Sequence, residues 1–239
     1  DHGKNHLEKT FKRPIIQRIF RSFLSLTLPN PKVFRTLSVL VNIVRPLNFI
    51  FPEFIKNSMK LMPARLPKKT LKTQKIYSVT KKIPVARVAL LTGCVQRVIS
   101  PEINESTIRL LNRHQVEVIV LPEINCCGSL DHHMGKEKAA HELFKKNINL
   151  WYDEYLNSGL TAIISNTSGC GTTLKDYGFI FRDDKEMKKK AKKISELTKD
   201  VSEFLDKDIK LEFKKNDKTY KIAYHSPCSM QHGQKVHQQ

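Results

Sequence analysis

Five cysteines are the residues of this chain best suited to chemistry, and they stand at positions 94, 126, 127, 170 and 228. Glycines flank the first four of them, namely Gly93, Gly128, Gly169 and Gly171. A glycine lets the backbone approach a bulky inorganic centre closely, and its N–H group can point at sulfur. An odd number of cysteines in a chain of 239 residues argues against a secreted disulfide framework. Reduced thiols that bind metal or carry out redox chemistry fit better.

Four thiolates supply one ligand to each iron of a cubane [4Fe–4S] cluster, and they satisfy tetrahedral zinc equally well. A third interpretation is that the cysteines are simply buried as small hydrophobic residues. We expect Cys94, Cys126, Cys127 and Cys170 to hold a metal centre, because all four stand in glycine-flanked loops that directly follow predicted strands. Cys228 also follows such a strand and is a further candidate ligand.

No side chain is predicted to be catalytic. His132 and His133 follow the double cysteine, and His225 and His232 surround Cys228. Each could bind metal, carry a proton or donate a hydrogen bond to a ligand, and none is assigned as a general base. The chain contains no nucleophile elbow, phosphate loop, dinucleotide fingerprint or HExxH motif.

The elements that must position the cysteines alternate between strand and helix. Short apolar runs predict strands at 88–91, 116–121, 161–165 and 220–224, and amphipathic spacing predicts helices at 101–114 and 136–155. Loops at 93–94, 125–128 and 168–171 follow the first three strands, and charged helical segments extend to about 205. The pattern predicts an α/β, Rossmann-like domain with a largely parallel sheet, whose strand ends converge on one crevice.

The first third of the chain has a different character. Apolar residues recur at helical spacing after Pro14, and Asn30–Pro31 looks like the cap and first residue of a second helix. Residues 60–84 are rich in Lys and Pro and are predicted to be a solvated linker. We therefore expect a basic helical connector at 1–84, a first cysteine-rich repeat at 85–215, and the start of a truncated second repeat at 216–239. The second repeat is suggested by the similar layout of residues 87–94 and 221–228.

The charge is concentrated in the connector. Residues 1–93 hold 19 basic and 3 acidic residues, a net charge of +16, whereas the remainder is close to balance at +3. Such a segment attracts nucleic acid, an anionic lipid surface or an acidic protein. Its amphipathic helices could pack on the rest of the protein, lie on a membrane or dock a partner subunit. No run of 18 uncharged apolar residues is present, so we predict no membrane span. Without an initiator Met or a signal pattern, the chain looks like a fragment.

The cysteine pattern resembles the cysteine-rich CCG domain of heterodisulfide reductase and of the iron–sulfur subunits of glycolate oxidase and anaerobic glycerol-3-phosphate dehydrogenase. The surrounding sequence is most similar to the glycolate oxidase subunit family. The segments that carry this likeness are LLTGCVQRVISPEIN, LLNRHQVEVIV, NCCGSLDHHMGKEKAA, SNTSGCGTTLKDYGF and YHSPCSMQHGQK, together with LPNPKVFR in the connector.

The resemblance implies an electron conduit without catalysis of its own. In that family, FAD-containing subunits oxidise glycolate to glyoxylate, and the iron–sulfur subunit passes electrons towards a membrane acceptor such as quinone. It implies that Cys94, Cys126, Cys127 and Cys170 bind a [4Fe–4S] cluster and that Cys228 opens a second motif. It further implies a cytoplasmic protein at the inner face of the cytoplasmic membrane.

The chain departs from the family pattern in three ways. It lacks the N-terminal ferredoxin-like cysteines and the second CCG, and Thr167 replaces the first cysteine of the terminal CxxC found in heterodisulfide reductases. The last departure favours a four-cysteine site over a five-cysteine one.

A heterodisulfide reductase-like or glycerol-3-phosphate dehydrogenase subunit is one alternative. A zinc-stabilised nucleic-acid-binding protein is another, but its aromatic residues lie on apolar helix faces and are not interleaved with the basic residues.

Overall fold

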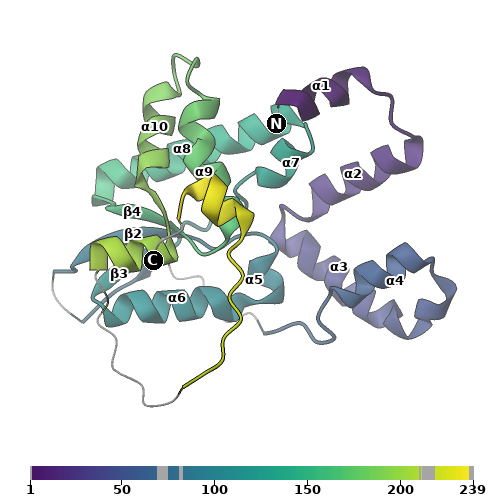
Figure 1. Ribbon diagram of the computed structural model, residues 1–239, viewed down its shortest axis with the longest axis horizontal. Helices are drawn as coiled ribbons and strands as arrows, with labels where there is room; N and C mark the ends of the chain where they lie inside the picture. Colours follow the sequence, from purple (N-terminus) through teal and green to yellow (C-terminus); the bar gives the residue numbers. More distant parts are fainter. Residues whose placement is uncertain (1, 69–74, 81–82, 210, 212–218, 237–239) are drawn as a thin grey trace. The chain divides into compact units, whose positions relative to one another are not determined.

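The computed structural model describes residues 2–68, 75–80, 83–209, 211 and 219–236. It confirms an α/β protein with a mostly parallel sheet (Figure 1). The strands are β1 Ile76–Tyr77, β2 Ala86–Leu91, β3 Val116–Ile119, β4 Ala162–Ser165 and β5 Thr198–Asp200. The α-helices are α1 His2–Thr10, α2 Ile15–Thr27, α3 Pro31–Val44, α4 Glu53–Lys60, α5 Gln96–Ile99, α6 Pro101–Arg113, α7 Ser129–His133, α8 Glu137–Ser158, α9 Ser168–Ile180, α10 Lys188–Leu197 and α11 Val201–Phe204. The remaining helical turns are η1 Arg45–Ile50, η2 Leu205–Ile209 and η3 Ser229–Gln234.

The chain forms two compact units that interleave along the sequence. The helical unit comprises Asp1–Gln74, Thr92–Ser106 and Pro122–Phe144. The sheet unit comprises Lys75–Leu91, Thr107–Leu121 and Lys145–Gln239. Because the helical unit takes up the loops after β2 and β3, three of the five cysteines belong to it. The predicted division into a connector, a first repeat and the start of a second repeat stays a prediction.

In the helical unit, local sequence signals set the helix starts. Asn30 caps α3, and its side-chain oxygen accepts hydrogen bonds from the backbone N–H groups of Lys32 at 3.1 Å and Val33 at 3.4 Å. Pro31 occupies the first turn, where a missing N–H group costs nothing. Both features confirm the helix that the Asn30–Pro31 pair predicts.

In the sheet unit, the strand order is β1-β3-β2-β4-β5. Parallel pairs join β2 to β3, β2 to β4 and β4 to β5, while β1 pairs antiparallel with β3. The chain leaves β2 in one direction to form β3 and then crosses back to form β4 on the other side. Right-handed crossovers therefore place helices on both faces, and Figure 1 shows α6 on one side of the strands and α8, α9 and α10 on the other.

The core of the sheet unit is built from the strands and the inner faces of these helices. Every residue of β3 and β4 is buried, as expected for parallel strands covered on both faces. The largest side chains with almost no exposed surface in this unit include Trp151, Tyr177 and Phe204. Such burial is the main stabilising contribution to a domain of this size.

Several predictions about elements were wrong, and tertiary contacts explain most of them. Residues 168–171 start helix α9, so Cys170 lies in a first helical turn and not in a loop. The predicted strand at 220–224 is absent, because Ile222 and Tyr224 are about 80% exposed and no sheet face buries them. Short strands β1 and β5, in regions predicted to be linker and helix, exist through pairing with β3 and β4.

The segment Pro31–Ile50 is long and apolar enough to cross a membrane by length and composition alone. The sequence alone did not predict this segment as a membrane span, because Arg35 and Arg45 interrupt its uncharged residues. Only 11% of the apolar window is buried inside the protein. The segment consists of α3 followed by η1. Because so little of it is buried, these two elements expose many apolar side chains.

We predict that Ile163→Ala destabilises the sheet unit by about 2–5 kcal/mol, since this β4 side chain is fully buried and its loss leaves a cavity. Chemical denaturation followed by circular dichroism measures the free energy of unfolding. The matched control is Ile83→Ala, at a side chain that is 81% exposed, for which a change within about 0.5 kcal/mol is expected. Equal losses for the two variants would contradict the described core.

Candidate functional site

Three of the five cysteines lie together in the helical unit. The Cys126 thiol interacts with the thiols of both Cys94 and Cys127, so the three sulfur atoms form a continuous group. Cys126 and Cys127 are each only 2% exposed, and Cys94 is half-buried. The structure therefore brings together Cys94 and Cys126, which are separated by 31 intervening residues in the sequence.

The loop that carries Cys94 is held by buried amides. Asn104 of α6 is fully buried, and its amide nitrogen donates to the carbonyl oxygen of Thr92 at 2.8 Å. Its side-chain oxygen accepts from the Gln96 amide at 3.1 Å. Gly93 has φ = 71°, a left-handed conformation that turns the chain into Cys94. Sequence inspection missed Asn104, whose only signal is a polar residue on the apolar side of a helix.

The double cysteine is shaped by Gly128. This residue has φ = 84°, and its backbone N–H donates to the Cys126 sulfur at 3.4 Å. A Cβ atom at Gly128 would lie 2.5 and 2.8 Å from two ring carbons of Phe144. The turn after Cys127 thus needs glycine both for its backbone conformation and for the space it leaves.

Proximity and burial make the grouped thiols reluctant to ionise. The hydrogen bond with Cys127, followed by burial, raises the pKa of Cys126 to about 12. The hydrogen bond with Cys126, with burial again, raises the pKa of Cys94 above its ordinary value. A metal ion supplies the positive charge that adjacent thiolates lack, and metal binding releases their protons. The donor set therefore suits a thiolate-bound metal centre.

Helix α7, which sequence inspection missed, lies directly after Gly128. Its Asp131 accepts a hydrogen bond from Ser25 of α2 at 2.5 Å, so it ties the cysteine loop to the connector. Burial, with repulsion from His133 and His141, lowers the pKa of His132 to about 4, which leaves the ring neutral at pH 7. His132 also packs edge-on against Phe144.

The other two cysteines belong to the sheet unit. Cys170 is half-buried in the first turn of α9, five residues after the end of β4. Cys228 is exposed and immediately precedes η3. Turn η3 packs on the start of α9, since Thr172 donates to the Ser229 carbonyl at 3.1 Å and Gln234 donates to the Ser168 carbonyl at 2.9 Å.

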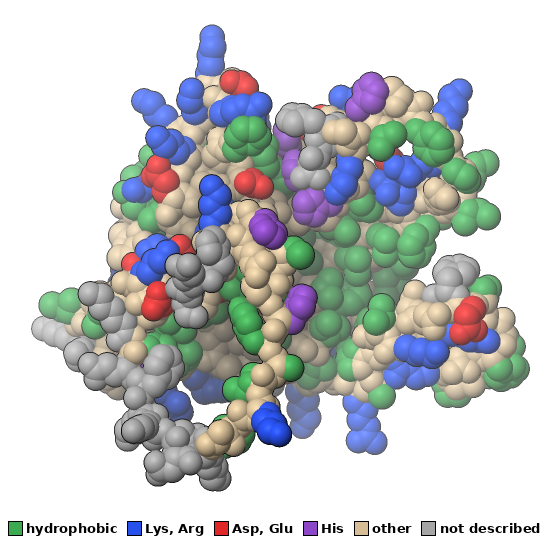
Figure 2. All heavy atoms as spheres, viewed as in Figure 1, with side chains coloured by type: hydrophobic (Ala, Val, Ile, Leu, Met, Phe, Trp, Pro, Cys, Tyr) green, Lys and Arg blue, Asp and Glu red, His purple; other side chains and the backbone are tan. Residues whose placement is uncertain are grey.

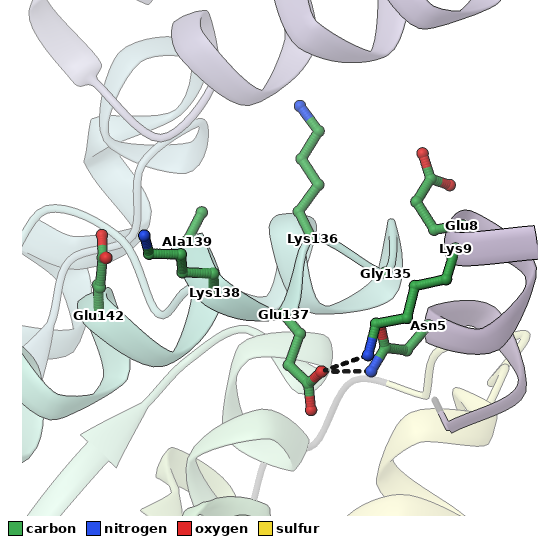
Figure 3. A pocket seen from close by; sticks show the side chains of 9 residues that line it. All are labelled: Asn5, Glu8, Lys9, Gly135, Lys136, Glu137, Lys138, Ala139 and Glu142. Atoms are coloured by element: carbon green, nitrogen blue, oxygen red, sulfur yellow. Dashed lines mark hydrogen bonds and ion pairs between the residues drawn. The ribbon is translucent and has the colours of Figure 1, made fainter.

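Among the described residues, no group of three or more His, Cys, Asp or Glu side chains stands in metal-binding geometry. A cavity of about 670 Å³ lies elsewhere in the helical unit, between α1 and the start of α8 (Figure 3). There Glu137 accepts a hydrogen bond from Asn5 and pairs with Lys9 at 3.8 Å. Glu8 and Glu142 also line it, so this cavity carries both charges and no thiol.

Comparisons with known proteins match the part of the chain that contains Cys94, Cys126, Cys127 and Cys170. Residues 88–175 match the family model described as a cysteine-rich (CCG) domain. The chain is 33% identical over 99% of its length to "Glycolate oxidase iron-sulfur subunit" of Escherichia coli, and 27% identical over 76% to a "Probable glycolate oxidase iron-sulfur subunit" of Bacillus subtilis. It is 26% identical over 60% of its length to "Lactate utilization protein A" of Geobacillus thermodenitrificans. The chain spans 54%, 40% and 58% of these relatives, and no solved structure matches it.

We predict that Gly128→Ala disrupts the cysteine loop. The new methyl group would meet the Phe144 ring, and the left-handed backbone alone costs about 1–2 kcal/mol for a residue with a Cβ atom. Chemical denaturation should show at least this loss in the free energy of unfolding. Gly159→Ala is the matched control, because Gly159 has a similar φ of 69° but nothing within 4 Å of a built Cβ. If the free energy of unfolding falls by the same amount in both variants, the close packing of Gly128 on Phe144 does not contribute to stability.

We also predict that Cys126 is the slower of two thiols to react in the metal-free chain. The thiolate is the reactive form, and burial and a raised pKa keep Cys126 protonated at pH 8, whereas Cys228 is exposed. Iodoacetamide labelling followed by peptide mass spectrometry should find Cys228 modified first. Labelling of Cys126 should accelerate as the pH rises towards 12. Equal rates at the two positions would contradict the buried sulfur group.

Proposed function

We propose that this chain, whose residues 88–175 match the cysteine-rich (CCG) domain, is an iron–sulfur electron-transfer subunit of a 2-hydroxy-acid oxidase complex. The observation that carries the proposal is the group of three interacting thiols at Cys94, Cys126 and Cys127, of which the last two are almost completely buried. Glycolate is the substrate of the complex that the naming of the relatives supports best, and lactate is the second candidate.

In this proposal Cys170 is the fourth ligand. Leu91, at the end of β2, pairs with Ser165, at the end of β4, and the two strands are parallel. The loops to Cys94 and Cys170 therefore start from adjacent strand ends, where the strand order reverses direction. Ligand sites of open α/β sheets form at such a position. A [4Fe–4S] cluster is the cofactor proposed, and zinc is the alternative that four thiolates also accept.

When bound, the cluster supplies reversible one-electron transfer. The chain's own residues exclude water from Cys126 and Cys127, which are almost completely buried. The Gly128 N–H donates to the Cys126 sulfur, and hydrogen bonds to sulfur tune the redox potential of such centres. The neutral His132 ring adds no charge beside the double cysteine. No residue of this chain is assigned a catalytic role.

The partners in this proposal are FAD-containing subunits, which would oxidise the hydroxy acid, and a membrane acceptor such as quinone. The net charge of +16 in residues 1–93 favours a place on the anionic inner face of the cytoplasmic membrane. Nucleic acid is a weaker candidate, since most of the exposed apolar side chains of the connector are aliphatic and cannot stack on bases, although Phe11, Phe20, Phe23 and Phe49 are exposed as well. Cys228 would open a second cysteine-rich repeat from 216 onwards.

We predict that the anaerobically purified chain is brown and contains iron and acid-labile sulfide in excess of zinc. Replacing Cys126 with Ser should remove most of the iron and the broad visible absorption, because this residue is central in the sulfur group. Iron analysis and absorption spectroscopy measure both effects.

The matched control is Cys228→Ser, at the exposed cysteine that precedes η3. The iron held by the first four cysteines should remain in this variant. A colourless wild-type chain with stoichiometric zinc would overturn the electron-transfer assignment, and unchanged iron in Cys126→Ser would remove Cys126 from the ligands.

A further inference from the structure

The connector contains a second, independent feature, a basic cavity at the end of the helices α3 and α4. A cavity of about 440 Å³ is lined by Arg45, Lys56 and Lys60 together with Asn48, Met59, Met62 and Ala64. None of the described residues that line it is acidic. The cavity is therefore cationic, and it lies within the helical unit alone.

Arg45 makes this cavity suitable for an anion. The carbonyl groups at the end of a helix carry partial negative charge and would repel an anion. Arg45 donates hydrogen bonds to the carbonyl oxygens of Met59 at 2.7 Å and Met62 at 2.6 Å, so these groups are already satisfied. Glu53, outside the cavity lining, pairs with Lys56 at 3.6 Å, but its carboxylate is 71% exposed, which makes this a weak surface pair.

The residues next to the cavity in the sequence are apolar and exposed. In η1, Leu47, Phe49 and Ile50 are 50%, 71% and 63% exposed, and Leu61 after α4 is 83% exposed. Further exposed apolar residues continue along α2 and α3, including Ile16, Ile19, Leu40 and Ile43. Figure 2 shows Lys and Arg side chains beside hydrophobic ones over the α3–α4 part of the unit.

The positive charge around the cavity favours an anionic ligand. Residues 15–62 hold seven basic residues and one acidic residue. Exposed aliphatic and aromatic side chains flanked by cations are typical of helices that lie in the surface of an anionic bilayer. A cavity with three cations beside such an apolar surface would accept the phosphate group of a phospholipid. The acyl chains of the same lipid would then contact the neighbouring apolar residues.

We propose that the cavity lined by Arg45, Lys56 and Lys60 binds the phosphate headgroup of an anionic phospholipid, with the exposed side chains of η1 and Leu61 in contact with the acyl region. The location of the chain at the membrane surface, on which this binding rests, comes from the proposed function. The site lies on the connector and involves none of the cysteines.

The test is co-sedimentation of the purified chain with phosphatidylcholine vesicles that contain or lack phosphatidylglycerol. The chain should bind the anionic vesicles more tightly than the neutral ones, and binding should weaken with added salt. The double variant Lys56→Gln/Lys60→Gln should lower the affinity for anionic vesicles by about tenfold or more, since each Lys near such a surface contributes about 1 kcal/mol. Circular dichroism verifies that the fold is retained.

The matched control is Lys188→Gln/Lys189→Gln, which removes the same charge from exposed positions on α10. It should bind anionic vesicles like the wild type. A second variant, Phe49→Ser/Ile50→Ser, should weaken binding without unfolding the chain, because both side chains are exposed.

Three results would overturn the proposal. They are equal binding to neutral and anionic vesicles, equal losses in the cavity variant and the α10 control, and binding of inorganic phosphate that the cavity variant abolishes while its vesicle binding stays at the wild-type level. The last result would identify a free phosphate site. Iron content measured in the same samples separates this inference from the proposed function, since vesicle binding without a cluster would refute only the latter.

Discussion

The parallel pairing of β2 with both β3 and β4 determines where the cysteine-bearing segments leave the sheet. Parallel strands end at the same edge of a sheet, so the loops after β2, β3 and β4 all begin from that edge. Each of these loops leads to at least one of the first four cysteines. The segments that carry these cysteines therefore all start from one edge of the sheet unit, which a chain with antiparallel hairpins in this order would not allow.

The regular elements around this edge could be predicted from sequence because each had a local signal. Apolar runs predicted β2, β3 and β4, helical spacing predicted α6 and α8, and the Asn30–Pro31 pair predicted the start of α3. Short elements whose existence depends on a partner could not be predicted in this way. The charged strand β5 forms by pairing with β4, and Cys170 lies in a helical turn although its glycines suggested a loop.

The proximity of Cys94, Cys126 and Cys127 agrees with the sequence pattern, their role as ligands stays a prediction, and the residues that support them could not be predicted. The contact between Cys94 and Cys126 is tertiary. Their separation in the sequence does not predict it, but their positions after two predicted strands do. Asn104, which holds the backbone at Thr92, looks in sequence like any polar residue of an amphipathic helix. Gly128 was noted as a neighbour of the cysteines, but its close packing on Phe144 required the folded structure. The role of Cys228 also depended on a strand at 220–224 that the structure does not contain.

We propose that thiolates from separate strand ends hold a single iron–sulfur centre. X-ray absorption at the iron edge of the anaerobically purified chain tests it most directly. We expect a first shell of sulfur atoms and a second shell of nearby iron. Iron surrounded by nitrogen or oxygen ligands, without a neighbouring iron, would contradict it.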